Sequence, residues 1–277
     1  MFASLALRYL ATRNISDRYA ADLQTLCRRL DEWWHYSRWP RAEEMLEWLR
    51  AEAARRSPAT VNTHRRMLLA LCRFGRRNPR LPAFRETLRP PMAWTVDEFS
   101  KILATASRRS GRIAGVSAGD WWVALLLTIY WTGARIGSVM SAAPHDADLA
   151  AALLILTKTK NGRVAVYRLH VQAVEALRRI YDPCAARLFA WPRSRWTLFR
   201  QLRRIVELAG VPCPRTAFNL FHRLRRTTLS YCWAADPGLA QRQADHSTPE
   251  LTRRRYVDPR IAGCLLSAAD VLPRPEF

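Results

Sequence analysis

A proline-rich segment with no hydrophobic period interrupts the chain at residues 78–92 (NPRLPAFRETLRPPM). It holds four prolines, and each proline lacks a backbone N–H and pushes the residue before it out of the helical region. Helical patterns end before this segment and resume after it. We therefore predict two domains, residues 1–85 and 93–277, joined by a linker over residues 86–92.

The first domain is predicted to be helical. Ser16 or Asp17 is the predicted cap of a run in which apolar residues recur every three or four positions, the period of a helix with one buried face. Ser57 is followed by Pro58, a residue favoured at the first position of a helix, and a second such run begins there. With a third pattern over residues 42–56, these signals predict three helices joined by short turns.

The helix predicted to begin at Ser57 has a polar and basic face opposite its apolar face. Asn62, Arg65 and Arg66 lie on the polar face. Arginine binds phosphate oxygens through two parallel hydrogen bonds, so we predict that these three residues contact DNA. A solvated surface face is the alternative interpretation.

The second domain is predicted to be mostly helical with one β-hairpin. Thr95 begins a capping box, the signal of a helix N-terminus, and the apolar run at residues 121–131 predicts a buried helix. Asn161 and Gly162 separate two β-branched runs within residues 153–169, which is a strong hairpin signal. Further helices are predicted over residues 171–181, 194–209, 220–234 and 249–256. The predicted fold class is therefore α+β, mostly α.

The chain carries a formal net charge of +22, because 45 Lys+Arg stand against 23 Asp+Glu. A charge of this size favours a polyanionic partner, and we predict nucleic acid, with an anionic membrane surface as the alternative. No apolar run reaches the roughly 20 residues that span a bilayer. Insertion into a membrane is therefore not expected.

Six cysteines are spread along the chain without a CxxC pair. This spacing favours neither a zinc site nor a disulfide framework. Free thiols suit the reducing cytosol, so we predict a cytoplasmic protein.

Two clusters carry cations at unusual places. Arg135 lies beside glycines directly after the predicted buried helix, where backbone and guanidinium can approach a ligand. Lys158 and Lys160 lie at the predicted hairpin tip, in a chain whose only other lysine is Lys101. Lysine with a lowered pKa can donate a proton where arginine cannot. Each cluster alone also fits a plain surface contact.

Two further clusters combine histidine with arginine or tyrosine. His222 and Arg225 are three residues apart on a predicted helix and share a face, so one can transfer a proton while the other binds a phosphate oxygen. His246 precedes a predicted helix that ends at Tyr256 among three arginines, where positive charge favours a phenolate. Taken alone, His222 and Arg225 also fit a basic helix that contacts DNA, and Tyr256 also fits an ordinary packing tyrosine.

In this order and spacing the clusters together resemble the tyrosine recombinases, or phage integrase family. The family's catalytic pattern falls on Arg135, Lys158, His222, Arg225, His246 and Tyr256. Lys160 competes for the lysine position, but the offset of Lys158 to the following strand fits better. Residues 1–85 resemble the family's helical core-binding domain, most clearly over residues 57–65, and the remainder resembles its catalytic domain.

The resemblance implies a reaction that needs neither metal nor ATP. Tyr256 attacks a scissile DNA phosphate and leaves a 3′-phosphotyrosine and a free 5′-hydroxyl. Arg135 and Arg225 bind the non-bridging oxygens, and Lys158 protonates the departing oxygen. His222 assists proton transfer from Tyr256, and His246 binds the phosphate region. We also predict that Lys160 contacts DNA.

The resemblance further implies that the two domains clamp double-stranded DNA and that four copies assemble in a synaptic complex. The sequence leaves open whether accessory DNA-bending proteins take part. We expect the apolar segment at residues 261–271 to dock on a neighbouring copy, with docking on its own copy as the alternative. The implied setting is the nucleoid of a prokaryote, a phage or a mobile element.

Three residues differ from the family's usual pattern. Ser138 stands where an acidic residue is usual, Arg223 where aspartate or a similar residue is usual, and Asp245 where glycine is usual. These departures leave open a DNA-binding protein with this fold and impaired catalysis. A nicking and resealing enzyme like the type IB topoisomerases, which uses the same chemistry, is a further alternative.

Overall fold

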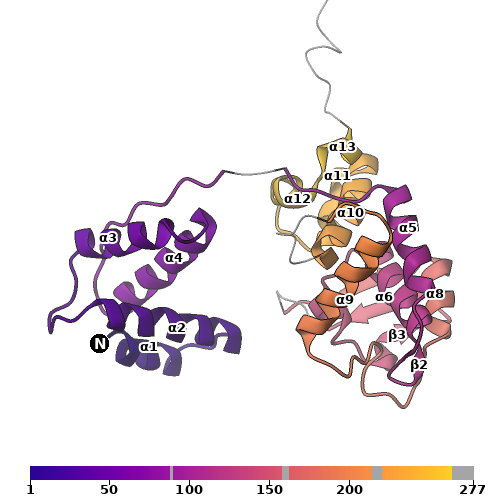
Figure 1. Cartoon of the computed structure of the whole chain (residues 1–277), viewed down its shortest axis with the longest axis horizontal. Coiled ribbons are helices and arrows are strands. Elements are labelled where there is room, and N and C mark those ends of the chain that lie inside the picture. The colour runs from indigo at the N-terminus through magenta and orange to yellow at the C-terminus, as the bar shows by residue number, and fades with distance from the viewer. Residues whose placement is uncertain (88–89, 158–161, 214–219, 264–277) are drawn as a thin grey trace, which may run out of the picture. The chain divides into compact units, whose positions relative to one another are not determined.

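The computed structural model describes residues 1–87, 90–157, 162–213 and 220–263 (Figure 1). Lys158, Lys160 and most of the segment at residues 261–271 lie outside the described residues. The chain divides into two compact units, Met1–Leu88 and Arg89–Phe277, and each is described by itself.

The first unit is helical throughout its regular structure. Its described helices are α1 (Phe2–Ala11), α2 (Asp17–Trp33), α3 (Ala42–Ala53) and α4 (Pro58–Phe74). Ser16 and Ser57 cap α2 and α4 by accepting hydrogen bonds from backbone N–H groups in the first turn, as the sequence predicts. Helix α1 has no comparable cap signal; instead the carboxylate of Asp31 accepts from the backbone N–H groups of Phe2 and Ala3.

The second unit contains the longer series of elements. In chain order they are α5 (Val96–Ser107), β1 (Arg112–Ile113), β2 (Val116–Ser117), α6 (Ala118–Thr132), α7 (Ile136–Val139), a 3₁₀ turn (Pro144–Asp146), β3 (Ala147–Asp148), β4 (Leu153–Leu156), β5 (Ala165–Arg168), α8 (Val171–Arg178), α9 (Arg195–Leu208), α10 (Leu220–Ala235), α11 (Pro237–Ala244), α12 (Pro249–Tyr256) and α13 (Pro259–Ala262).

Two small antiparallel sheets accompany these helices. Strands β1 and β2 form a two-stranded ribbon, and β3, β4 and β5 form a sheet in that order. The register pairs Leu153 with Arg168 and Leu156 with Ala165, so β4 and β5 are the two arms of the predicted hairpin. The α+β, mostly α fold class is confirmed.

Helix α6 lies at the centre of the second unit and is buried almost all round, as its unbroken apolar run predicts. It packs against α5, α8 and α10. The helix ends at Gly133, whose backbone is left-handed with φ +62° and whose added Cβ would come within 3.2 Å of the Thr228 side chain. This tight turn fixes the position of Arg135, which follows Gly133 by two residues.

Some boundaries and short elements differ from the prediction. Helix α3 ends at Ala53 rather than residue 56, and α8 ends at Arg178 rather than residue 181. The short helices α7, α11 and α13 were not predicted. Among the described residues, none of the helices has both the length and the apolar character needed to cross a bilayer, and the cysteines are unpaired.

Candidate active site

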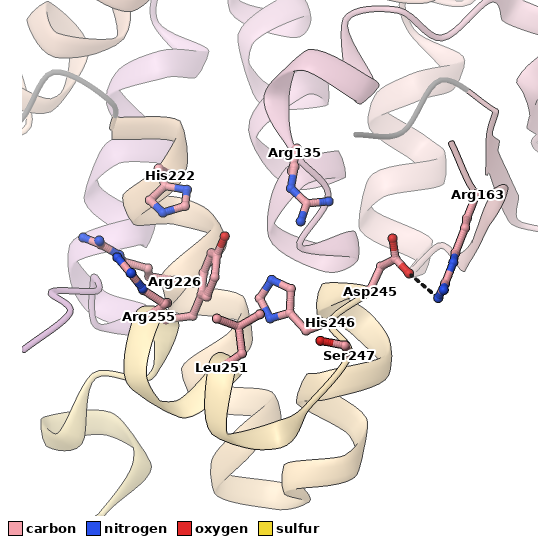
Figure 2. Close-up of a pocket in the computed structure, with 10 residues that line it drawn as sticks. Arg135, Arg163, His222, Arg226, Asp245, His246, Ser247, Leu251 and Arg255 are labelled. Atoms are coloured by element: carbon pink, nitrogen blue, oxygen red, sulfur yellow. Dashed lines mark ion pairs between the residues drawn. The ribbon is translucent and has the colours of Figure 1, made fainter. Parts of the chain in front are cut away.

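Four parts of the second unit meet around one cavity of about 630 Å³ (Figure 2). They are the turn after α6, the face of α10, the α11–α12 turn, and the end of α12, with one residue from the strand region before β5. The lining residues are Arg135, Arg163, His222, Arg226, Asp245, His246, Ser247, Leu251, Arg255 and Tyr256. Four of the six residues that resemble the family's catalytic set therefore line this single cavity.

Tyr256 is surrounded by the predicted partners. Its ring centroid lies 5.0 Å from that of His222 and 4.8 Å from that of His246. The guanidinium carbon of Arg225 lies 5.1 Å from the centre of the same ring. These residues are up to 34 positions apart in the chain, and the packing of α10, α11 and α12 against one another brings them together.

Hydrogen bonds to two distant segments of the chain hold the end of α12 in place. The carboxylate of Asp258 is almost fully buried, and it accepts from the backbone N–H of Ala93 at 2.8 Å. The Asp258 backbone N–H donates to the Ser230 hydroxyl on α10, also at 2.8 Å, and that hydroxyl donates to the carbonyl of Arg226. These bonds hold the backbone beside Tyr256 against α10.

His246 is oriented by the helix that follows it. Its Nδ1 lies 2.9 Å from the hydroxyl of Thr252, a fully buried residue of α12. Its carbonyl accepts from the Gln241 side chain. Since Nδ1 is occupied, Nε2 is the ring nitrogen available to a ligand.

The backbone conformation of Asp245 explains why aspartate can stand where the family usually has glycine. Its backbone is left-handed, with φ +52°, at the end of α11. Glycine adopts this conformation without strain, and aspartate is among the few other residues that tolerate it. Its carboxylate also forms an ion pair with Arg163 at 4.0 Å.

Both histidines are neutral at pH 7. Burial, then the positive charges of Arg226 and Arg225, lower the pKa of His222 to about 4. Burial, then the charges of Arg225 and Arg135, lower the pKa of His246 to about 4. A neutral imidazole offers one acceptor and one donor nitrogen, as proton transfer beside a phosphate requires.

Arg225 lies under Tyr256 rather than in the cavity lining. It is 2% exposed, and its two terminal nitrogens donate to the backbone carbonyls of Gly133 and Ala244. Arg225 therefore ties the end of α6 to the end of α11, directly beneath the ring. The positive charge of Arg225 therefore lies next to the cavity, although the residue does not line it.

Arg223 points away from the cavity. Its guanidinium group lies over the ring of Trp94 and donates to the carbonyls of Ala93 and Pro212. The residue that departs from the family pattern here therefore attaches the beginning of the second unit to α10. Ser138 is buried within α7.

The residues predicted to contact DNA in the first unit differ in their surroundings. Asn62 is buried, and its amide bonds the backbone of Phe84 and the carboxylate of Glu86. Asn62 thus does not lie on the exposed face predicted for it. Arg65 is half-buried and donates to the carbonyl of Leu81, whereas Arg66 is exposed.

Two arginines that line the cavity were not predicted from the sequence. Arg226 is four residues after His222 on α10 and so shares its face, and Arg255 directly precedes Tyr256. Helical spacing was the available signal for Arg226. No group of three or more potential metal ligands occurs within the part of the chain that the structure describes.

Solved structures of integrases and recombinases share this fold. The Tn1549 transposon integrase in complex with a circular intermediate DNA matches at TM-score 0.71 and 17% identity, over 91% of this chain and 93% of that one. A lambda integrase dimer bound to a COC′ core site matches at TM-score 0.70 and 19% identity, over 95% and 97%. XerH recombinase bound to a palindromic difH substrate matches at 0.66 and 19%, over 91% and 78%.

No protein-family model matches the chain, and no curated protein matches it by sequence. The structural matches establish the fold, and the predicted resemblance to tyrosine recombinases is confirmed at that level.

Proposed function

We propose, from this fold and from the surroundings of Tyr256, that the protein is a site-specific DNA recombinase that cuts and rejoins strands through a 3′-phosphotyrosine. One observation carries the proposal: a tyrosine ring contacts two neutral histidines in a cavity whose lining holds four arginines and a single carboxylate. Such a cavity suits an anion that reacts with the phenol. The DNA-bound state of the structurally similar integrases and recombinases supports duplex DNA as the substrate.

Arg135 is the best-placed group to bind the scissile phosphate. It lines the cavity, and its side chain has no hydrogen-bond or ion-pair partner among the described residues. A guanidinium group can donate to both non-bridging oxygens at once. It thereby offsets the negative charge that would repel the attacking phenol oxygen and stabilises the pentacoordinate transition state.

The bond changes are balanced within the site. The Tyr256 oxygen attacks phosphorus, the bond from phosphorus to the 5′-oxygen breaks, and the phenol proton passes to His222. The 5′-oxygen takes up a proton, which we assign to Lys158 by its resemblance to the family lysine. The reverse steps, with a second 5′-hydroxyl as the attacking group, rejoin the strand.

Binding of DNA prepares His222 for its role. Burial, with the positive charges of nearby arginines, holds the pKa of His222 at about 4 in the free protein. A phosphate in the cavity adds negative charge beside it and raises that pKa, so His222 becomes a stronger base when substrate is present. His246, oriented by Thr252, donates or accepts through Nε2 at the same phosphate.

Recombination joins two duplexes, so we propose that four copies act together on DNA. Of the three residues predicted to contact DNA in the first unit, Arg66 is the exposed one, and it is our candidate DNA contact there.

Trapping on nicked DNA tests this function. Duplexes that bind the Tyr256→Phe protein are selected from a random-sequence pool, and a nick is placed systematically along them so that a cut releases a short fragment. The unaltered protein should become covalently attached, while Tyr256→Phe should bind without attachment. Binding without attachment by the unaltered protein on every nicked duplex would support a DNA-binding role alone. Relaxation of supercoiled plasmid without exchange between sites would support the topoisomerase-like alternative.

A further inference from the structure

Three cavity arginines have no partner of opposite charge. The side chains of Arg135, Arg226 and Arg255 form no hydrogen bond and no ion pair with any other described residue. Asp245, the one carboxylate among the described residues that line the cavity, pairs with Arg163 instead. In the proposed reaction Arg135 binds the scissile phosphate, whereas Arg226 and Arg255 have no assigned ligand.

Arg226 is the more constrained of the two. It lies on the face of α10 that carries His222, and its Nε is buried without a hydrogen-bond partner among the described residues. Burial lowers the pKa of this guanidinium group, in agreement with its partly buried position. A buried donor of this kind is stabilised when a ligand accepts from the group.

Arg255 reaches the same cavity from a different helix. It occupies the last turn of α12, next to Tyr256, where the helix end favours positive charge. Its neighbours in that turn have other surroundings: Arg253 pairs with Glu250, and Arg254 lines a separate pocket. Of the three consecutive arginines, only Arg255 lines the cavity that contains Tyr256.

The charges are spread along the cavity. Figure 2 shows Arg226 and Arg255 at one end, Arg163 and Asp245 at the other, and Arg135 and His246 between them. Two guanidinium groups at one end repel each other unless an anion lies between them. A single phosphate held by Arg135 at the centre leaves that end uncompensated.

A DNA strand supplies the second anion. Its phosphates follow one another at about 3.4 Å along the helix axis, and a cavity of about 630 Å³ holds more than one of them. We infer that Arg226 and Arg255 together bind the phosphate adjacent to the scissile phosphate on the same strand. This inference rests on the proposed function.

The second contact sets the position of the strand. Phosphate contacts fix register on DNA without reading its sequence, and a reacting phosphorus must face its nucleophile closely for attack. Two phosphates held at separate points determine which phosphorus faces Tyr256. Loss of the Arg226 and Arg255 contact should therefore slow cutting.

Substrates with single neutral phosphates test the pairing. In the selected nicked duplex, one phosphate at a time is replaced by a methylphosphonate at each of the positions flanking the cut. Arg226→Gln and Arg255→Gln should each slow covalent attachment by about tenfold or more on unmodified DNA, since each removes a charge-assisted contact. When one adjacent phosphate is neutral, the unaltered protein already attaches more slowly. On that substrate, the same variants should slow attachment by less than about a further twofold.

The controls separate this coupling from general charge loss. Arg254→Gln removes an equal charge one residue away and should change attachment by less than about twofold on every substrate. Arg226→Lys keeps the charge and should recover part of the rate. Thermal unfolding of each variant reports whether the fold persists, and Arg255, which is exposed, serves where Arg226 variants fail to fold.

The attachment rates on the methylphosphonate substrates distinguish three outcomes. Coupling of Arg226 and Arg255 to one adjacent phosphate supports the inference. Equal effects of these variants on all methylphosphonate substrates, with attachment intact, overturn it and leave the proposed function standing. Failure of the unaltered protein to attach to any nicked duplex contradicts both.

Discussion

At the scale of single residues, backbone conformation accounts for Asp245. Its φ of +52° lies in the left-handed region, and the turn it forms aims His246 into the cavity. The sequence shows an aspartate where the family usually has glycine, and only the backbone angle explains why both residues fit. The departure is therefore compatible with a formed site.

Substitution at this position should follow backbone strain. Asp245→Asn should change the free energy of unfolding by less than about 0.5 kcal/mol, because asparagine tolerates the left-handed region. Asp245→Val should lower it by about 1–2 kcal/mol, because a β-branched side chain clashes there. Urea unfolding measures both, and equal stability of the two variants would contradict the assignment of strain.

The lowered pKa values of the cavity histidines predict a pH dependence. An unfolded histidine binds a proton below about pH 6.5, whereas folded His222 and His246 stay neutral until about pH 4. Between these values the unfolded state binds more protons, so stability falls as the pH is lowered. The free energy of unfolding should decline from pH 7 to pH 5.

His222→Gln provides the comparison, because it removes one of the two protonation sites. Urea unfolding at a series of pH values should show a smaller decline for this variant than for the unaltered protein. An identical decline in both proteins would mean that His222 does not have the lowered pKa.

At the scale of elements, the attachment of α12 decides where Tyr256 lies. Asp258 follows the helix, is 1% exposed, and links the backbone of Ala93 with Arg260. Asp258→Ala should lower the free energy of unfolding by about 1–3 kcal/mol, because it leaves a buried N–H without an acceptor. Covalent attachment to nicked DNA should slow as well, since Tyr256 loses its anchor.

Asp97→Ala is a suitable control, because Asp97 is an exposed residue in the first turn of α5. It should change attachment little. An Asp258→Ala protein that keeps both its stability and its rate would contradict the anchoring role.

Elements with strong local signals were predictable from sequence. Ser57 and Thr95 cap helices at the predicted residues, and Ser16 is one of the two caps predicted for α2. Strands β4 and β5 pair as the two arms of the predicted hairpin. Helix α1 was missed because its beginning is fixed by Asp31, which lies on another helix. Short helices such as α7 carry too few residues for a periodic pattern.

The candidate site was predictable where a motif carried it and unpredictable where packing decided it. The motif brought Arg135, His222, His246 and Tyr256 to one cavity. Sequence alone does not show that Arg225 is buried under the tyrosine ring, because carbonyls of two other elements occupy its guanidinium group. Nor does it show that Asn62 is buried, since its partners lie more than 20 residues away.

At the scale of the whole molecule, the excess of positive charge governs affinity. Phosphate contacts release counterions, and a protein that neutralises 6–10 phosphates loses about 10³–10⁵ in affinity between about 50 and 200 mM salt. With a net charge of +22, the protein should show a loss in this range on duplex DNA. Fluorescence anisotropy with the Tyr256→Phe protein measures it without covalent attachment.

Vesicles of anionic lipid serve as the control for the competing polyanion. At 150 mM salt the protein should bind duplex DNA more tightly than it binds anionic vesicles that present the same total concentration of negative charge. Tighter binding to the vesicles, or a DNA affinity that changes less than tenfold over the salt range, would contradict nucleic acid as the main partner.

The identity of the bond between protein and DNA tests the central claim most directly. After attachment to a nicked duplex, digestion and mass spectrometry should find a nucleotide joined through its 3′-phosphate to the peptide that contains Tyr256, with a free 5′-hydroxyl on the released strand. A link to any other residue, or a link through a 5′-phosphate, would contradict the account.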